Sequence, residues 1–187
     1  YQESSLARYF CLLLGEKFCY REKSEIVKKH YTIYRGIENV YRNPEYIQLF
    51  DISNCSISNH GLKRISILLT NAFSEDEELD LEHEAKLYKE VIRRYDIDYV
   101  IKHPREKYRK VPSTIKVIGE SLVAEEVILN LAQSSKVFLY GFYSTVLLNL
   151  ADTPNISLIN IKVKLKKPTL GLDDVFEQLG VSSVELI

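Results

Sequence analysis

The sequence predicts an α/β fold with a parallel sheet covered by helices on both faces. From residue 64 onward, short apolar segments of strand length alternate with longer segments of helical periodicity. The strand segments, such as Ile65–Leu69, are continuous apolar runs, which is typical of strands buried on both sides. The chain has 187 residues, 45% of them hydrophobic, and is therefore long enough to bury such a core. These observations favour a Rossmann-like architecture.

The elements can be placed one by one along this part of the chain. Leu81, Tyr88 and Val91 recur on one face at helical spacing and predict a helix over residues 79–95. Further helices are predicted over residues 123–132, 143–151 and 172–179. Strands are predicted over residues 65–69, 98–102, 114–118, 136–140 and 156–163. We therefore expect residues 64–187 to form one Rossmann-like domain.

The first third of the chain has a different pattern. Apolar residues at helical spacing from Leu6 to Leu14 predict a helix within residues 1–30 that is capped by Ser4 or Ser5. Residues 31–34 are β-like, and turn signals interrupt the rest of the segment up to residue 63. Residues 1–63 are thus expected to be linking helices and an irregular connector. The apolar face of the first helix makes a homodimer a further expectation.

Charge and cysteine content exclude several classes of protein. There are 25 Lys and Arg against 26 Asp and Glu, a net charge of −1, so general binding to nucleic acid is not expected. The basic stretches 102–110 and 162–167 could serve such a role, but they lack aromatic interleaving on an exposed sheet face. Three cysteines at spacings that match no metal motif indicate reduced thiols. We expect no metal ion and no cofactor.

Ligands of doubly wound sheets bind beyond the carboxyl ends of the strands, so the residues there are the candidates for chemistry. His103 and Pro104 directly follow a predicted strand and begin a basic loop. The cations suit an anionic ligand such as phosphate, and His103 could give a proton to a leaving phosphate oxygen. A structural or surface role for this histidine is the alternative.

A second candidate follows the strand over residues 136–140. Gly141, Tyr143, Ser144 and Thr145 open a predicted helix, where backbone N–H groups and two hydroxyls form a natural phosphate cradle. The alternative is that Ser144 or Thr145 merely caps the helix. The glycine patterns of a dinucleotide fingerprint and of a P-loop are absent.

Carboxylates complete the candidate site. Glu125 and Glu126 lie in the first turn of a predicted helix, where they either offset the helix dipole or bind ribose hydroxyls. Asp76 lies in an acidic loop just past a strand end, on the same edge as His103, and could act as a general base. Asp80 is the fallback for that role.

In this order, the strand–His–Pro, Glu-bearing helix and strand–Ser–Thr patterns resemble the bacterial sialyltransferases, which carry a His-Pro motif and a Ser-Ser/Thr motif. Within that group the chain is most similar to glycosyltransferase family 52, the lipooligosaccharide sialyltransferases. The resemblance spans nearly the whole chain. It is carried by residues 30–36, 67–69 and 99–105, by Glu125-Glu126 and by Tyr143-Ser144.

The resemblance implies a GT-B architecture, of which this chain would be the C-terminal, donor-binding half. The acidic-acidic-Gly motif that ends the first domain in the family is not found here, because Asp173-Asp174 is followed by Val. The first domain is therefore expected to be missing from this chain, which could leave it inactive alone. A bacterial cytoplasmic location is implied, and peripheral attachment of the full-length protein to the inner membrane is left open.

The implied reaction is an inverting, metal-independent transfer of sialic acid from CMP-sialic acid to a hydroxyl of a surface glycan. The donor and that acceptor are the expected partners. By this resemblance His103 assists departure of CMP, Pro104 shapes the base or phosphate contact, and Asp76 is the base. Glu125 binds the ribose, while Tyr143, Ser144 and Thr145 hold the phosphate. A noncatalytic nucleotide-binding domain and a transferase with another sugar donor remain the alternatives.

Overall fold

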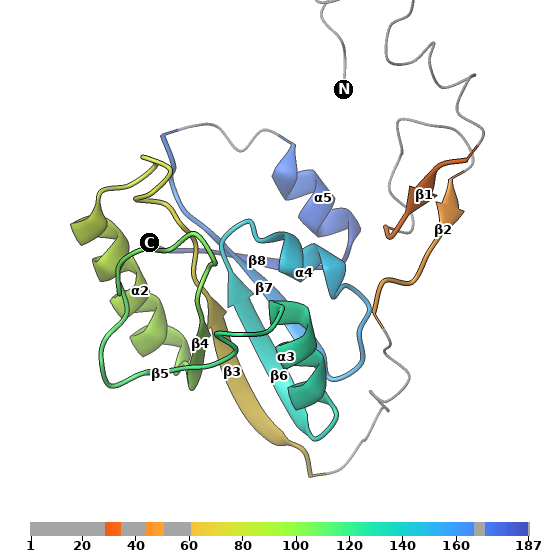
Figure 1. Ribbon diagram of the computed structural model, residues 1–187, viewed down its shortest axis with the longest axis horizontal. Coiled ribbons are helices and arrows are strands. Elements are labelled where there is room, and N and C mark those ends of the chain that lie inside the picture. Colours follow the sequence, from red (N-terminus) through yellow and green to blue (C-terminus); the bar gives the residue numbers. More distant parts are fainter. Residues whose placement is uncertain (1–28, 35–43, 51–60, 167–170, 187) are drawn as a thin grey trace, which may run out of the picture. The chain divides into compact units, whose positions relative to one another are not determined.

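The computed structural model describes residues 29–34, 44–50, 61–166 and 171–186 (Figure 1). The chain divides into two compact units, Tyr1–Leu49 and Phe50–Ile187. In the first unit, strand β1 (Tyr31–Thr32) pairs in parallel with β2 (Glu45–Tyr46). The β-like segment at residues 31–34 is thus present in part, whereas the predicted helix within residues 1–30 lies almost wholly outside the described residues.

The second unit contains a six-stranded sheet in the order β5-β4-β3-β6-β7-β8, and every neighbouring pair is parallel. The fold class predicted from the sequence is therefore confirmed. The strands are β3 (Lys63–Leu69), β4 (Tyr99–Ile101), β5 (Lys116–Val117), β6 (Ser135–Gly141), β7 (Ile156–Lys162) and β8 (Ser182–Glu185).

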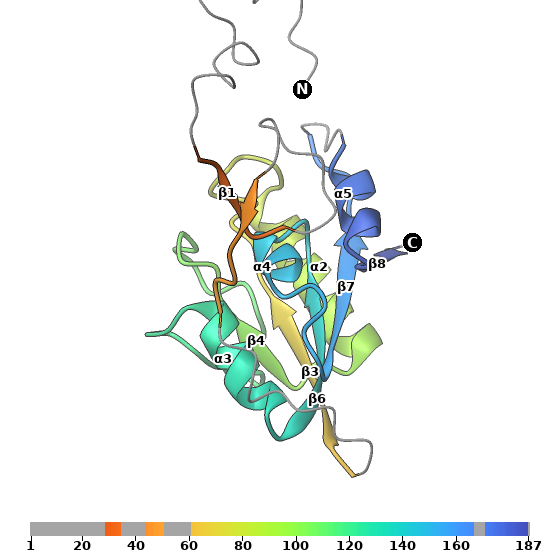
Figure 2. The same cartoon turned by 90° about the vertical axis from the view of Figure 1, so that its right-hand side faces the viewer.

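The helices cover both faces of this sheet. They are α2 (Leu81–Tyr95), α3 (Ala124–Ala132), α4 (Thr145–Asn149) and α5 (Leu172–Gln178). Right-handed crossovers in this strand order put α2 on one face and the other three helices on the opposite face. Figure 2 shows α2 and α3 on opposite sides of the sheet.

The core beneath α2 explains why this helix forms. Tyr88 and Val91 are fully buried against Leu68 of β3, Val100 of β4 and other apolar residues of the sheet. Asp80 caps the helix, because its Oδ1 accepts a hydrogen bond from the His83 N–H at 2.8 Å. The helical spacing of apolar residues in the sequence therefore corresponds to the face of α2 that packs against the sheet.

Two strands are absent from the sequence predictions. Strand β8 is short, lies at the edge of the sheet and is mostly exposed, and β2 contains two exposed residues. Neither has the apolar run or the alternation that marks a strand in a sequence. The other predicted elements of residues 64–187 are present, with ends that differ by a few residues.

The order of the strands places a topological switch between β3 and β6. The chain moves outward from β3 through β4 to β5, returns by α3 to β6, and then moves outward on the other side. In such sheets the crevice at the carboxyl ends of the two switch strands is the usual ligand site. Within the described residues, no helix is both long and apolar enough to cross a membrane.

Candidate functional site

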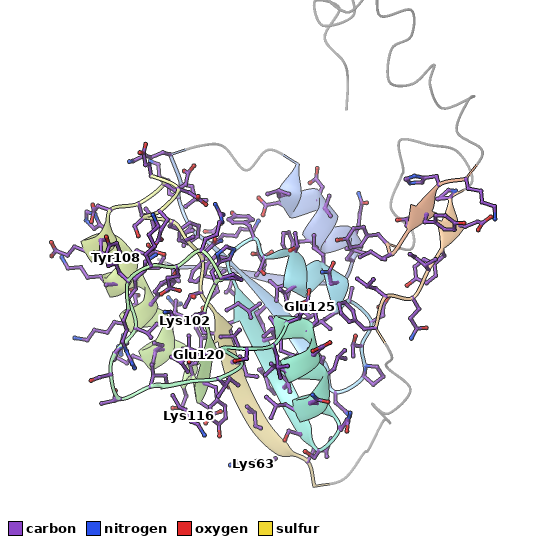
Figure 3. All side chains as sticks on the ribbon, viewed as in Figure 1. Lys63, Lys102, Tyr108, Lys116, Glu120 and Glu125 are labelled. Atoms are coloured by element: carbon purple, nitrogen blue, oxygen red, sulfur yellow. The ribbon has the colours of Figure 1, made fainter. Side chains whose placement is uncertain are left out.

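A cleft of about 880 Å³ lies at the carboxyl edge of the sheet, beside the switch between β3 and β6. The loops after β3, β4, β5 and β6 all contribute to its walls. Figure 3 labels Glu125 on α3, Glu120 in the loop before that helix, and Lys102 just after β4. Most of the predicted site residues line this cleft: His103, Pro104, Glu125, Tyr143, Ser144 and Thr145.

His103 is half-buried in the cleft wall. Its Nδ1 accepts a hydrogen bond from the Arg105 N–H at 3.2 Å, so the neutral ring carries its proton on Nε2. No hydrogen bond from the described residues reaches Nε2. Burial, with a smaller contribution from the Arg105 charge, lowers the pKa of His103 below its ordinary value. A bound anion would oppose both effects, so the ring is suited to take up a proton together with such a ligand.

Pro104 lies exposed beside His103 and also lines the cleft. The loop that carries both residues turns sharply, because the Glu106 N–H donates to the His103 carbonyl at 3.0 Å. Lys102, on the other side of His103, adds a cation to the same wall. This part of the cleft therefore offers positive charge and a proton-bearing ring to an anion.

Glu106 is a site residue that the sequence interpretation missed. Its side chain is buried, and Oε2 accepts a hydrogen bond from the Thr70 hydroxyl at 2.5 Å. Oε1 is also buried, with no hydrogen-bond partner among the described residues. Burial raises the pKa of Glu106 above its ordinary value. Its place three residues after His103 was a signal, but a charged residue in a basic loop is normally exposed.

Glu125 occupies the first turn of α3 and is 6% exposed. Its Oε1 accepts a hydrogen bond from Asn149 Nδ2 at 2.8 Å, which fixes the carboxylate against the end of α4. The N-cap residue Val123 supplies no side-chain hydrogen bond, so the first turn of α3 faces the cleft without a cap. A carboxylate held in this way can accept hydrogen bonds from ligand hydroxyls.

The turn after β6 carries the Ser–Thr motif. Gly141 is buried beneath it rather than in the cleft wall, and a Cβ at this position would lie 3.3 Å from Leu147 Cδ1 and 3.4 Å from Ser144 Cβ. The glycine therefore lets the turn approach the strand closely. Tyr143 has a φ of 50°, which turns the chain so that Ser144 and Thr145 reach the cleft.

Ser144 also has the capping role that the sequence offered as an alternative to phosphate binding. It is the N-cap of α4, and its Oγ accepts a hydrogen bond from the Val146 N–H at 3.3 Å. Capping and ligand binding are compatible, because a hydroxyl has one proton to donate and two lone pairs. Thr145 is exposed at the same helix start.

The two aspartates proposed as a base have other partners in the structure. Asp76 forms a bidentate pair with Arg105, at 2.6 Å to Nη1 and 2.8 Å to Nη2, and does not line the cleft. Asp80 caps α2, and hydrogen bonds from the backbone and ring of His83 lower its pKa. The Asp76 pair does place this side chain next to the His103 loop, as the sequence predicted for this edge.

A buried ion cluster joins the loops after β3 and β4. The Lys110 ammonium group is fully buried between the carboxylates of Glu75 and Glu84, at 2.8 Å from the latter. Burial alone would raise the pKa of Glu75, but hydrogen bonds from Lys110 and from the Lys107 N–H outweigh it and lower the pKa to about 2. The cluster, Lys110–Glu75–Glu84, therefore ties the acidic loop to the basic loop.

Among the residues that the structure describes, no three or more His, Cys, Asp or Glu side chains are arranged to hold a metal ion.

A His-Pro loop, a buried carboxylate and a Ser–Thr helix start thus meet around one cleft. Residues 6–165 match the model of glycosyltransferase family 52. The chain belongs to this family. Its membership confirms the resemblance that the motifs indicated.

Two curated relatives of this chain are named as sialyltransferases. The chain is 30% identical over 178 residues to a CMP-N-acetylneuraminate:beta-galactoside alpha-2,3-sialyltransferase of Pasteurella multocida, which covers 94% of this chain and 55% of that protein. It is 26% identical over 170 residues to an N-acetyllactosaminide alpha-2,3-sialyltransferase of Haemophilus influenzae, covering 90% and 52%. The family 52 chain described here thus spans about half the length of the curated relatives it matches.

Proposed function

We propose that this chain supplies the donor-binding half of a bacterial sialyltransferase and that its cleft binds the CMP part of CMP-sialic acid. The proposal extends the name of the Pasteurella relative to this chain. The observation that carries it is the meeting of His103, Glu125 and Ser144 in one cleft, although they follow three different strands. A proton donor, a carboxylate for ribose hydroxyls and a hydroxyl-bearing helix start are the groups that a nucleoside monophosphate requires.

The proposed reaction uses only the two substrates and side chains of the protein. The oxygen of an acceptor hydroxyl forms a bond to the anomeric carbon of sialic acid, while the bond from that carbon to a phosphate oxygen of CMP breaks. Protonated His103 gives its Nε2 proton to the leaving phosphate, and a carboxylate takes the proton of the acceptor hydroxyl. The products are the sialylated glycan and CMP. Attack opposite the leaving group inverts the anomeric centre.

Asp76 is the proposed base. Both of its oxygens are engaged by the Arg105 guanidinium, so Arg105 would have to move when the acceptor binds. The Arg105 side chain is 61% exposed, which leaves it free to reorient. In a turnover assay of the full-length enzyme, Asp76→Asn should abolish transfer, whereas Asp80→Asn should weaken only the capping of α2.

The binding part of the proposal can be tested on this chain by titration calorimetry with CMP, UMP and GMP. We expect a preference for CMP. Ser144→Ala removes a hydroxyl from the phosphate cradle, and His103→Ala removes the proton donor, so each should weaken CMP binding about tenfold or more. Ser157→Ala, in a second cleft lined by residues of β6, β7 and the turn before β8, is the matched control.

Equal binding of all three nucleotides, or unchanged CMP binding by Ser144→Ala, would contradict the assignment of this cleft to the donor. Binding of CMP without turnover by the full-length enzyme would instead favour a noncatalytic nucleotide-binding domain. Turnover with another activated sugar in place of CMP-sialic acid would keep the site but change the donor.

A further inference from the structure

The two residues that follow β3, Thr70 and Asn71, each hold one wall of the cleft. Strand β3 lies between β4 and β6 in the sheet, so its carboxyl end is flanked by the His103 loop on one side and the Ser–Thr turn on the other. Successive residues of an extended chain point in opposite directions. A Thr-Asn pair at this position can therefore bind both neighbours at once.

Thr70 fixes the backbone of the His103 loop through a closed set of hydrogen bonds. Its Oγ1 accepts from the His103 N–H at 3.0 Å and donates to Glu106 Oε2 at 2.5 Å. The Glu106 N–H in turn donates to the His103 carbonyl at 3.0 Å. Both backbone polar groups of His103 are thus held, and Thr70 itself is anchored because its N–H donates to the Ile101 carbonyl at 3.0 Å.

Asn71 holds the turn on the other side of the switch. Its Nδ2 donates to the Phe142 carbonyl at 3.1 Å. The N–H of the same peptide unit, that of Tyr143, donates to Asn160 Oδ1 of β7 at 2.8 Å. The two asparagines, one just after β3 and one in β7, thus hold the carbonyl and the N–H of one peptide unit. This peptide directly precedes the Cα of Tyr143, whose φ of 50° turns Ser144 toward the cleft.

Asn71 is itself fixed from the side of α2. Its N–H donates to the Tyr88 hydroxyl oxygen at 2.8 Å, and the fully buried Tyr88 donates to Glu84 Oε1 at 2.6 Å. Asn71 is therefore anchored to the core beneath α2 through Tyr88, rather than to mobile surface groups.

We propose that Thr70 and Asn71 are positioning residues that set the separation of His103 and Ser144 across the cleft. Thr70 acts on the histidine side through Glu106, and Asn71 acts on the Ser–Thr side together with Asn160. The inference rests on the proposed function, because it assigns these residues to the same ligand site. Neither the family match nor the names of the relatives assigns a role to them.

The test uses isosteric variants of the 187-residue chain. Thr70→Val removes the hydroxyl, and Thr70→Ser keeps it. Asn71→Leu removes the Nδ2 donor without adding a charge to the cleft, which Asn71 also lines. The matched controls lie at the opposite edge of the sheet: Thr153→Val removes another buried threonine hydroxyl, and Asn155→Leu removes an Nδ2 that donates to the Ala132 carbonyl at 3.0 Å.

Two measurements are made on each variant. Calorimetry gives the CMP dissociation constant, and nitrogen-detected NMR gives the titration of the His103 ring and the resonances of the His103 and Tyr143 amides. The charged groups that act on His103 are Arg105, Asp76, Glu75 and Lys110, and no substitution changes them. A shift in the His103 titration therefore reports a change in its position.

The expected results differ between the two sides of the cleft. Thr70→Val should weaken CMP binding about three- to tenfold, the loss expected for one hydrogen bond, and should shift the His103 titration and amide. Thr70→Ser should restore both. Asn71→Leu should weaken binding to a similar extent and shift the Tyr143 amide, but leave the His103 titration unchanged. The two controls should bind CMP like the unmodified chain.

The proposal is overturned if the variants at 70 and 71 match their controls, or if each changes both sides equally, as general loosening of the fold would do. Failure of the proposed function has a different signature. In that case the unmodified chain does not bind CMP, yet the NMR measurements on the His103 ring and the two amides still decide whether Thr70 and Asn71 hold separate walls.

Discussion

The buried ion cluster and the cleft are neighbours at the carboxyl edge of one sheet, yet they treat charge in opposite ways. In the cluster, Lys110 is fully buried but lies between two carboxylates, and Glu84 also accepts from the backbone N–H groups of Phe73 and Ser74. In the cleft, Glu106 keeps one buried oxygen without a partner among the described residues, and His103 lines the cavity without a hydrogen bond from those residues to Nε2.

The contrast separates structural groups from candidate functional groups. Charges that are satisfied inside the protein hold loops together, and they leave no capacity for a ligand. Polar atoms that the fold buries but leaves unpaired are costly, and they are found where a ligand completes the set. By this criterion Glu75 and Glu84, two carboxylates of the acidic segment 75–84, are structural.

The largest effect should come from breaking the cluster. Lys110→Met leaves two buried carboxylates without their cation, and should lower the free energy of unfolding by about 3–5 kcal/mol. Chemical denaturation followed by circular dichroism measures this. Lys86→Met removes the exposed pair with Glu82 and is the control, for which little change is expected. Equal stability of the two variants would mean that the cluster does not hold the loops.

The next effect concerns a glycine in the cleft wall. Gly119 has a φ of 76°, and a Cβ there would lie 2.8 Å from Val127 Cγ2 on α3. Gly119→Ala should therefore cost about 1–3 kcal/mol and also weaken ligand binding by displacing α3. Gly180→Ala is the control, because its φ of 70° is similar but nothing lies within 4 Å of an added Cβ. A greater loss of stability at Gly180 would contradict this account.

The two regions should respond to pH with opposite signs. The pKa of Glu75 falls from 4.5 to about 2 on folding, so its contribution to stability is present above 4.5 and is lost as the pH drops toward 2. The pKa of Glu106 is raised, so its contribution is present below 4.5 and is lost as the pH rises through the raised value.

Glu75→Gln and Glu106→Gln should separate these contributions in denaturation curves measured from pH 3 to pH 8. The first variant should lose stability at neutral pH and flatten the acid limb. The second should gain stability relative to the unmodified chain as the pH rises above 4.5. The comparison fails if both substitutions shift the curve in the same direction at neutral pH.

The smallest expected effect is a proton taken up with the ligand. Because the pKa of free His103 is lowered, a bound phosphate should raise it, and CMP binding should strengthen as the pH falls through and below 6.5. Calorimetry in buffers with different ionisation heats gives the number of protons, expected to be a fraction of one. CMP itself titrates near pH 6, so His103→Gln is needed as the control and should retain only that part. Equal proton uptake by the unmodified chain and by His103→Gln would show that His103 does not contact the phosphate.

The sheet and its helices were predictable because their signals are local. Apolar runs such as Ile65–Leu69 and the helical spacing of Leu81, Tyr88 and Val91 depend on burial alone, and the strand-end rule then indicated where His103 and Ser144 would meet. Strand β8 was not predictable, since it is held at an edge by backbone pairing with β7 and lacks an apolar pattern.

The partners of the site residues could not be predicted in the same way. Contacts such as Thr70 with Glu106, Asn71 with the Phe142 carbonyl, and Asp76 with Arg105 join residues 29 to 71 positions apart. They depend on which loops the strand order brings together, and a single sequence does not contain that order. The acidic loop therefore suggested a base, while the structure places Asp76 in an ion pair.

The central claim is that the cleft beside the switch between β3 and β6 is the donor site. The most direct test is to titrate the isotope-labelled chain with CMP and follow its backbone amide resonances. The account predicts shifts at His103, Glu125 and the Tyr143–Thr145 turn, and none in the second cleft of about 570 Å³ near Ser157 and Gly180. Shifts confined to the second cleft, or none at saturating CMP, would contradict it.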